Sequence, residues 1–378
     1  MGLRSSDLRG RAKKEMEEER IPFDISRVVK TLQESLKASD KKQLQDEIRK
    51  LKQKSGRGVM LESDKALNYA PIGDDLTQIM ESQTIERAKY YVKRLIKSLT
   101  SVKTNGINDI NLYRWREYDE VITDSLWIFD RRDTSGSHLG WYWGNFVPQI
   151  PHQVILRFTK SGDWILDPFA GSGTTLIECI RLGRNGIGVE ISQSTFDRTL
   201  PLLTDEPNRF GTSSILKKGD STSLNFTELC RKNGTAKVQL VIMHPPYFDI
   251  IKFSKDARDL SNAGSIRKFL SKLGKVVRST TKVLQDGRYL VLVVGDKYQD
   301  GEWIPLGFYS MQEVMKYGYK LTGIITKNFD DTRGKRDQKE LWRYRALAGG
   351  FYVFKHEYSF IFKKTKGKGK WGRSGLNR

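Results

Sequence analysis

The stretch Asp-Trp-Ile-Leu-Asp-Pro-Phe-Ala-Gly-Ser-Gly-Thr-Thr (163–175) determines the fold expected of this chain. Its apolar start predicts a strand, Gly171 and Gly173 predict a tight turn, and the residues after the turn open a helix. In an open parallel sheet a ligand binds at the carboxyl end of such a strand, where glycines let the backbone approach it closely. We therefore expect a ligand-binding α/β domain.

The glycine turn lacks the signatures of two phosphate-binding loops. Thr174 follows Gly173 where a Walker loop needs a lysine, and Leu176 stands where the dinucleotide fingerprint needs its third glycine. Glu190 ends the next predicted strand, where its carboxylate can accept both hydroxyl hydrogens of a ribose. Asp220 follows a third apolar stretch, where it can hydrogen-bond an adenine amino group. This order of groups describes S-adenosylmethionine better than a nucleotide phosphate.

The rest of the chain divides by its pattern at about residue 115. Beyond that point short apolar runs alternate with helical segments, which is typical of a largely parallel sheet. Strands are predicted at residues 164–166, 186–191, 240–243, 289–294, 320–326 and 358–362. Helices are predicted at residues 174–182, 194–203, 265–284 and 309–317.

Before residue 115, apolar residues recur at three- and four-residue spacing over 25–36, 44–51 and 85–99, which predicts amphipathic helices. We expect a helical N-terminal region (1–115), a catalytic α/β domain (116–364) and a flexible basic tail (365–378). The N-terminal region fits an ordinary helical subdomain, a dimerising hairpin or a DNA-reading element, and the pattern does not choose among them.

The composition indicates a polyanionic partner. The formal net charge is +21 over 378 residues. Nucleic acid fits better than a membrane, because no apolar run approaches the roughly 18 residues needed to span one and no signal peptide is recognised at the N-terminus. Cys179 and Cys230 are the two cysteines, without CxxC spacing, so we expect reduced thiols, no zinc site and an intracellular protein.

The sequence His-Pro-Pro-Tyr (244–247) ends the predicted strand 240–243. Pro245 and Pro246 cannot donate to the sheet, so the chain leaves it with carbonyls that suit a hydrogen-bond donor such as the amino group of a base. Tyr247 offers a flat face to a base that has been extruded from a duplex. The alternative is a tight turn with Tyr247 in the core.

Together, residues 167–175 and 244–247 resemble the S-adenosylmethionine-dependent amino-methyltransferases of DNA, which produce N6-methyladenine or N4-methylcytosine. The resemblance covers roughly residues 120–364. It implies a Rossmann-like methyltransferase with a mostly parallel seven-stranded sheet. It implies catalytic roles for His244, Pro245, Pro246 and Tyr247. The cofactor contacts that it implies are at Phe146, Pro148, Asp167, Pro168, Phe169, Gly171, Gly173, Thr174, Glu190 and Asp220.

Two departures from the family pattern bear on function. His244 stands where the family has Asp, Asn or Ser, so it can accept an amino hydrogen only as a neutral imidazole. No insertion is large enough for a separate recognition domain, so if any part of this chain reads the target, it is the N-terminal helices or the basic segment at 332–345. The expected nucleic-acid contacts are Arg333, Lys335, Arg336, Arg343 and Arg345. A solvated charged face is the alternative for that segment.

The sequence thus predicts a DNA methyltransferase that acts on cytosine N4 or adenine N6 in a specific sequence by base flipping. The expected partner is double-stranded DNA, with a restriction endonuclease of the same system as a further candidate and neither metal nor membrane. The expected location is the cytoplasm, at the nucleoid. The rival readings are an RNA base amino-methyltransferase and a DNA-binding subunit whose catalytic domain has lapsed. A protein-glutamine methyltransferase would leave the charge unexplained, and the oligomeric state stays open.

Overall fold

The computed structural model describes residues 25–55, 59–63, 66–70, 72–328 and 339–365. The chain forms two compact units. The first consists of the described residues up to Asn105 together with Ile110–Asp119. The second consists of Gly106–Asp109 and the described residues from Glu120 onward.

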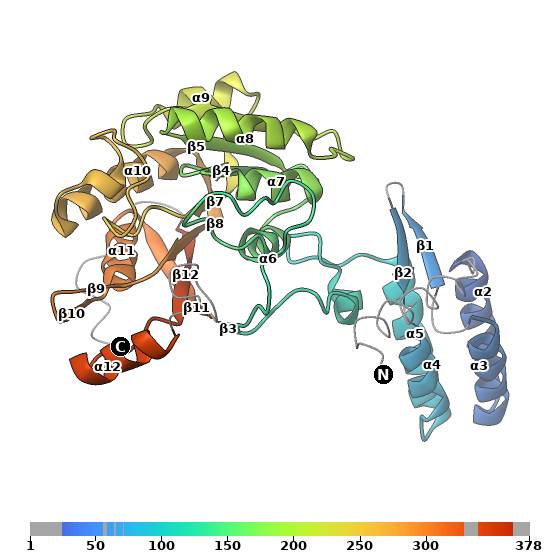
Figure 1. Cartoon of the computed structure of the whole chain (residues 1–378). Coiled ribbons are helices and arrows are strands. Elements are labelled where there is room, and N and C mark those ends of the chain that lie inside the picture. Colours follow the sequence, from blue (N-terminus) through green and yellow to red (C-terminus); the bar gives the residue numbers. More distant parts are fainter. Residues whose placement is uncertain (1–24, 56–58, 64–65, 71, 329–338, 366–378) are drawn as a thin grey trace, which may run out of the picture. The chain divides into compact units, whose positions relative to one another are not determined.

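The first unit is mainly helical (Figure 1). Its elements are α2 (Ile25–Ser35), α3 (Lys41–Ser55), the antiparallel hairpin of β1 (Val59–Ser63) and β2 (Ala66–Ala70), α4 (Gly73–Met80), α5 (Ile85–Thr100) and the 3₁₀ helix η1 (Leu112–Glu117). The predicted helical stripes are confirmed, because apolar residues at those spacings, such as Leu32, Ile48 and Val92, are fully buried in one core. The hairpin and α4 lie between two predicted helices and were not expected.

The second unit is built on an eight-stranded sheet in the order β3-β11-β12-β8-β7-β4-β5-β6. Its strands are β3 (Leu126–Trp127), β4 (Trp164–Asp167), β5 (Asn185–Glu190), β6 (Ser214–Lys218), β7 (Val238–Met243), β8 (Leu284–Val294), β11 (Tyr319–Asn328) and β12 (His356–Lys364). Only β12 runs antiparallel to its neighbours. The mostly parallel sheet is confirmed, but it has eight strands rather than seven, since the two-residue β3 adds to the edge at β11.

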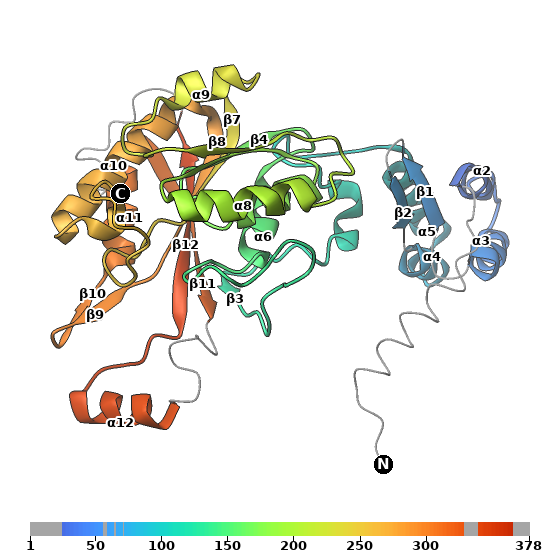
Figure 2. The same ribbon diagram turned by 45° about the horizontal axis from the view of Figure 1, so that its top comes forward.

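Helices cover both faces of this sheet (Figures 1 and 2). They are α6 (Gln149–Phe158), α7 (Thr174–Arg181), α8 (Gln193–Asp205), α9 (Phe226–Lys232), α10 (Ile266–Val283) and α11 (Leu306–Met315). Successive residues of a strand point to opposite faces. Leu240 and Ile242 of β7 therefore pack in one apolar cluster with α6, while Val241 and Met243 pack in the other with α9 and α10.

The four helices predicted for this unit are confirmed, with shifts of a few residues at their ends. The sequence missed α6, α9, α12 (Lys339–Gly349), the short η2 (Leu260–Asn262) and the hairpin of β9 (Lys297–Gln299) and β10 (Glu302–Ile304). Pro151 obscures α6, although proline is tolerated in the first turn of a helix. Both cysteines are free and buried, as expected. Within the described part of the chain, no helix combines the length and the apolarity that a membrane crossing needs.

Candidate active site

The glycine turn between β4 and α7 is held in place by Asp167, the last residue of β4. This fully buried carboxylate accepts hydrogen bonds from the backbone N–H of Phe169, at 2.8 Å, and from the hydroxyl of Thr175, at 2.6 Å. Burial raises the pKa of Asp167 to about 6, and these two hydrogen bonds oppose the rise. Asp167 therefore fixes the shape of the turn.

Both glycines of the turn adopt positive φ, at +51° for Gly171 and +78° for Gly173. A Cβ at Gly171 would lie 3.0 Å from the ring of Tyr142, and a Cβ at Gly173 would lie 2.8 Å from Cγ2 of Thr199 in α8. Gly171 therefore permits a close approach on the ligand side. Gly173 permits the close packing of α8 instead.

A cavity of about 860 Å³ opens where the parallel strands β4, β5, β6 and β7 end. Its walls include the glycine turn, Glu190 at the end of β5, the segment after β6, and the turn at 244–247 after β7. The cavity thus brings Gly171 and Tyr247 together, which is the arrangement that the sequence argument requires.

Most of the residues predicted for the site line this cavity. They are Phe146, Pro168, Phe169, Gly171, Glu190, Asp220, His244, Pro245, Pro246 and Tyr247. Four predicted cofactor contacts do not line it: Pro148, Asp167, Gly173 and Thr174. Pro148 stands at the N-terminus of α6. The hydroxyl of Thr174 donates at 2.7 Å to Asn145, which does line the cavity. These four residues support the wall instead of forming it.

Glu190 is 6% exposed and lies against two backbone N–H groups. Gly171 donates to Oε2 at 3.0 Å, and Ser192 donates to Oε1 at 2.6 Å. Burial raises the pKa of Glu190 to about 7; the two backbone hydrogen bonds oppose the rise and nearby Asp259 adds to it. Each carboxylate oxygen keeps a lone pair for a further donor, as the hydroxyls of a ribose would supply.

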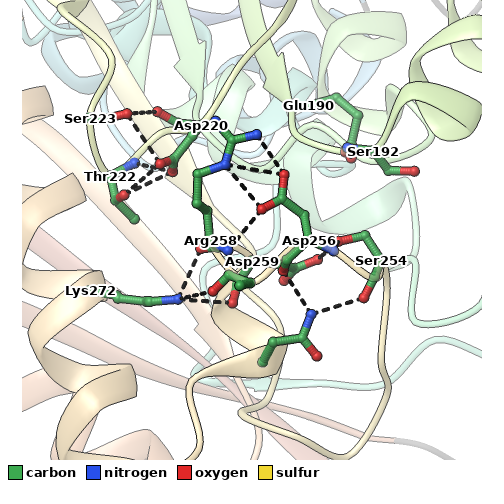
Figure 3. Close-up of polar contacts among 12 residues, drawn as sticks. Glu190, Ser192, Asp220, Thr222, Ser223, Ser254, Asp256, Arg258, Asp259 and Lys272 are labelled. Atoms are coloured by element: carbon green, nitrogen blue, oxygen red, sulfur yellow. Dashed lines mark hydrogen bonds and ion pairs between the residues drawn. The ribbon is translucent and has the colours of Figure 1, made fainter.

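Asp220 stands beside a tightly bonded loop at 254–262 (Figure 3). Its carboxylate accepts from the backbone and hydroxyl of Thr222 and from the hydroxyl of Ser223, so it is half engaged by its own turn. Across from it, Lys272 donates to the backbone carbonyls of residues 257, 258 and 259. That anchoring holds Asp259 and Leu260 in the cavity wall, a contribution that no motif in the sequence predicts.

The segment 129–147 forms a second wall and is fixed at its outer turn. His138 Nε2 lies 2.6 Å from Oε1 of buried Glu178, and His152 Nδ1 lies 2.7 Å from Oε2. His138, Glu178 and Asp133 are close enough together to suggest a metal site. Arg181, however, lies 3.6 Å from Asp133 and 3.8 Å from Glu178, so a cation already occupies this neighbourhood. We therefore interpret this cluster as a set of polar contacts that fixes the segment 129–147 to α7.

Arg132 is a charged residue of this wall with unused hydrogen-bonding capacity. Its Nη1 donates to the backbone carbonyl of Phe146 at 2.8 Å, while Nε and Nη2 are buried without a partner among the described residues. Burial lowers the pKa of Arg132, opposed by Asp133. Since a buried cation is costly without an anion, this guanidinium suits a negatively charged group of a ligand in the cavity.

The turn at 244–247 is held by residues from the distant strands β11 and β12. Tyr247 donates its hydroxyl hydrogen to Oε2 of Glu357 at 2.6 Å, and His244 Nε2 lies 3.0 Å from the same hydroxyl. Lys327 Nζ lies 3.5 Å from Oε1 of Glu357. Burial lowers the pKa of His244 to about 4, with Glu357 opposing and Lys327 reinforcing the shift. The neutral imidazole that the sequence argument requires is therefore the ordinary state near neutral pH.

The predicted nucleic-acid contacts lie on the connection between β11 and β12. Arg343 and Arg345 are exposed on α12. Arg333, Lys335 and Arg336 lie outside the described residues. The connection leaves β11 after Asn328 and enters β12 at His356. Asn328 and Glu357 line the cavity, whereas none of the described residues of α12 does.

Comparison with known proteins supports the resemblance to this family. A model of the N6/N4 methyltransferases, described as DNA methylase, matches residues 23–200. The resemblance to the DNA amino-methyltransferases is confirmed. The match includes the glycine turn and Glu190 and ends before His244. It also agrees with S-adenosylmethionine as the expected cofactor.

Individual relatives match parts of the chain. The Type II methyltransferase M.MjaII of Methanocaldococcus jannaschii is 49% identical over 51 residues, which are 14% of this chain and 10% of that protein. The tRNA (guanine(10)-N2)-dimethyltransferase of the same organism is 27% identical over 212 residues, 54% of this chain and 56% of that protein. TrmN from Thermus thermophilus has a TM-score of 0.38 at 12% identity, covering 58% of this chain and 49% of that one. The chain therefore spans about a tenth of the first curated relative and about half of the second.

Proposed function

We propose that the protein transfers a methyl group from S-adenosylmethionine to the exocyclic amino group of cytosine (N4) or adenine (N6) in duplex DNA. The observation that carries this proposal is the single cavity that joins the glycine turn to the His-Pro-Pro-Tyr turn. The glycine turn suits the cofactor and the His-Pro-Pro-Tyr turn suits an extruded base, so both reactants would meet in the same cavity.

The cavity offers a partner to each part of the cofactor. Glu190 would accept the ribose hydroxyls, and Asp220 would lie near the adenine. Gly171 would allow the close approach, and the orphaned nitrogens of Arg132 would bind the carboxylate. When bound, S-adenosylmethionine supplies an electrophilic methyl group on a positively charged sulfur.

The amino nitrogen of a nucleobase is a poor nucleophile because its lone pair is delocalised into the ring. We infer that the carbonyl of Pro245 and the side chain of His244 accept its two hydrogens, which favours a tetrahedral nitrogen with a localised lone pair. Tyr247 would hold the base by stacking, worth about 1–3 kcal/mol. Most of the rate would then come from positioning, and next from electrostatics.

The charge of the chain supports nucleic acid as the substrate. Exposed Arg343 and Arg345 on α12 would contact phosphates without reading sequence, so affinity would fall steeply with salt. Such a substrate would bring the protein to the nucleoid, and a sequence-specific methyltransferase would be a natural companion of a restriction endonuclease.

The deciding experiment is expression in a host free of DNA methylation, followed by digestion of genomic DNA to nucleosides and mass spectrometry. We expect a new N4-methylcytosine or N6-methyladenine peak. The Tyr247→Ala variant should lose that peak while still binding S-adenosylmethionine in a calorimeter. Normal methylation by this variant would refute the catalytic assignment.

An RNA base is the second candidate substrate, because the relative aligned over 212 residues is named as a tRNA methyltransferase. Digestion of total RNA from the same cells tests it, and methylated guanine or adenine there without any DNA product would favour it. A lapsed catalytic domain would yield neither product. Calorimetry with S-adenosylmethionine tests that reading, since tight binding would be unexpected of it.

A further inference from the structure

Four side chains at the His-Pro-Pro-Tyr turn are linked in series by hydrogen bonds and an ion pair. His244 and Tyr247 come from the turn itself, while Lys327 is the last residue but one of β11 and Glu357 is the second residue of β12. Lys327 is 5% exposed and Glu357 is 3% exposed, yet both line the cavity. The two strand residues lie 80 and 110 positions after Tyr247 in the sequence.

The directions of these hydrogen bonds follow from the number of hydrogens available. A carboxylate only accepts, so the single hydroxyl hydrogen of Tyr247 goes to Glu357, at 2.6 Å. The contact of 3.0 Å between that hydroxyl and His244 Nε2 then needs a hydrogen from the histidine. His244 would therefore carry its proton on Nε2, and Nδ1 would hold a free lone pair.

We propose that Glu357 is a positioning residue that acts through Tyr247 to hold His244 as the Nε2–H tautomer, so that Nδ1 accepts a hydrogen from the target amino group. This inference rests on the proposed function. It names a residue outside the motif on which the motif depends.

Packing already fixes where the two rings lie. The ring of Phe146 lies 4.7 Å from that of His244, and a Cβ added at Gly295 would lie 2.9 Å from Cε2 of Tyr247. Tyr247 therefore rests directly on the backbone that follows β8. With the rings held in this way, the position of the proton is what Glu357 determines.

Lys327 completes the device by compensating the charge. Removing a carboxylate from water is costly unless an opposite charge stands close by, and Lys327 Nζ lies 3.5 Å from Glu357 Oε1. The pair leaves Oε2 free to accept from Tyr247. Lys327 thus favours the ionised carboxylate, which cannot donate a hydrogen back to the tyrosine.

The first test measures the tautomer directly and needs no methylation. The chain contains four histidines, so labelling them with ¹⁵N and comparing the wild type with His244→Asn assigns the signal of His244. We expect Nε2 protonated and Nδ1 unprotonated at neutral pH in the wild type, and a mixture of tautomers in Glu357→Gln. A wild-type proton on Nδ1, or an unchanged tautomer in Glu357→Gln, would overturn the proposal.

The second test is a double-mutant cycle in methylation kinetics. Glu357→Gln keeps the shape of the side chain but can donate to Tyr247 as well as accept. We expect it to lower kcat by at least about tenfold, as other losses of a tautomer-fixing group do, with little change in KM for DNA. In the His244→Asn background the same change should cost less than about twofold, because an amide oxygen accepts without any tautomer.

The two tests separate the failure of the inference from the failure of the proposed function. Equal losses from Glu357→Gln in both backgrounds would assign Glu357 a packing role and refute the positioning role. Absence of any methylated base from wild-type protein would refute the proposed function. The ¹⁵N spectrum would still decide the tautomer in that case, and cofactor binding by each variant would show that it is folded.

Discussion

Replacing Gly173 by alanine should destabilise the second unit more than the same change at another glycine of equal φ. Gly173 adopts φ +78°, and an added Cβ would lie 2.8 Å from Thr199 Cγ2 and 3.2 Å from Leu203 Cδ2. Gly162, in the exposed turn before β4, adopts φ +81° with nothing within 4 Å of the added atom. The two positions share the backbone strain and differ in crowding.

The expected magnitudes follow from these two terms. The left-handed conformation costs an alanine about 1–2 kcal/mol at either site. Overpacking against α8 adds about 1–3 kcal/mol at Gly173 alone, because both contacts there are with buried or packed side chains. We therefore expect Gly173→Ala to lower the free energy of unfolding by about 1–3 kcal/mol more than Gly162→Ala.

Urea unfolding followed by tryptophan fluorescence measures this difference. The chain has two compact units, so the same transition must be compared in each variant, and the midpoint shift at constant slope gives the change. Equal losses in the two variants would mean that α8 moves away freely. The turn would then not be fixed by its packing on α8.

Three further results are expected. The pKa of Glu190 is raised to about 7, and Glu190 would bind ribose as a carboxylate, so the affinity for S-adenosylmethionine should weaken up to tenfold for each pH unit below about 7. Glu190→Gln should abolish this pH dependence. A wild-type affinity that calorimetry finds independent of pH would contradict the prediction. Arg132→Met should weaken binding of S-adenosylmethionine by about 2–3 kcal/mol but spare 5′-methylthioadenosine, which lacks the carboxylate. The control Arg231→Met, at an exposed position of α9 that does not line the cavity, should alter neither. Arg343→Ala and Arg345→Ala should each reduce the slope of log affinity against log salt by about 1 in filter binding, and an unchanged slope would remove α12 from the DNA interface.

The direction of the pH dependence of cofactor binding follows from the raised pKa of Glu190. A raised carboxyl pKa means that the folded protein holds a proton that the unfolded chain would have lost. In the free protein, Glu190 therefore contributes stability below about pH 4.5 that is lost as the pH rises through about 7. Ligand hydroxyls favour the ionised form, so binding releases this proton and becomes tighter as the pH rises.

Local patterns were sufficient to predict the glycine turn, Glu190 and the His-Pro-Pro-Tyr turn. Each consists of neighbouring residues at the end of one strand, and parallel strands bring such ends to one edge. Arg132, Lys327 and Glu357 could not be found in this way, because each lies in a segment with no motif of its own. Lys327 and Glu357 acquire a role only because the sheet order places β12 beside β8 and β11 beside β12. Arg132 acquires one only because its segment lines the cavity.

The placement of Asp167 and Gly173 shows a different limit. The sequence marks both as special, and both are, but it does not tell which atoms they face. The fully buried carboxylate of Asp167 accepts from Phe169 and Thr175 and does not line the cavity, and the missing side chain of Gly173 makes room for α8. A motif thus records the needs of the turn as well as those of its ligand.

By itself, His244 is a poor substitute for the Asp, Asn or Ser of the family motif, because a neutral histidine accepts a hydrogen through only one nitrogen, and its tautomer decides which one. The structure changes that reading. A buried pair such as Lys327 and Glu357 gains little stability, since the desolvation of two charges offsets their attraction. A domain that had lost its reaction would gain nothing by keeping that pair bonded to Tyr247 and, through it, to His244. The better explanation is that His244, Lys327 and Glu357 form one unit. Glu357, which is distant from His244 in sequence, determines through Tyr247 which nitrogen of His244 carries the proton, so that the other nitrogen can accept an amino hydrogen.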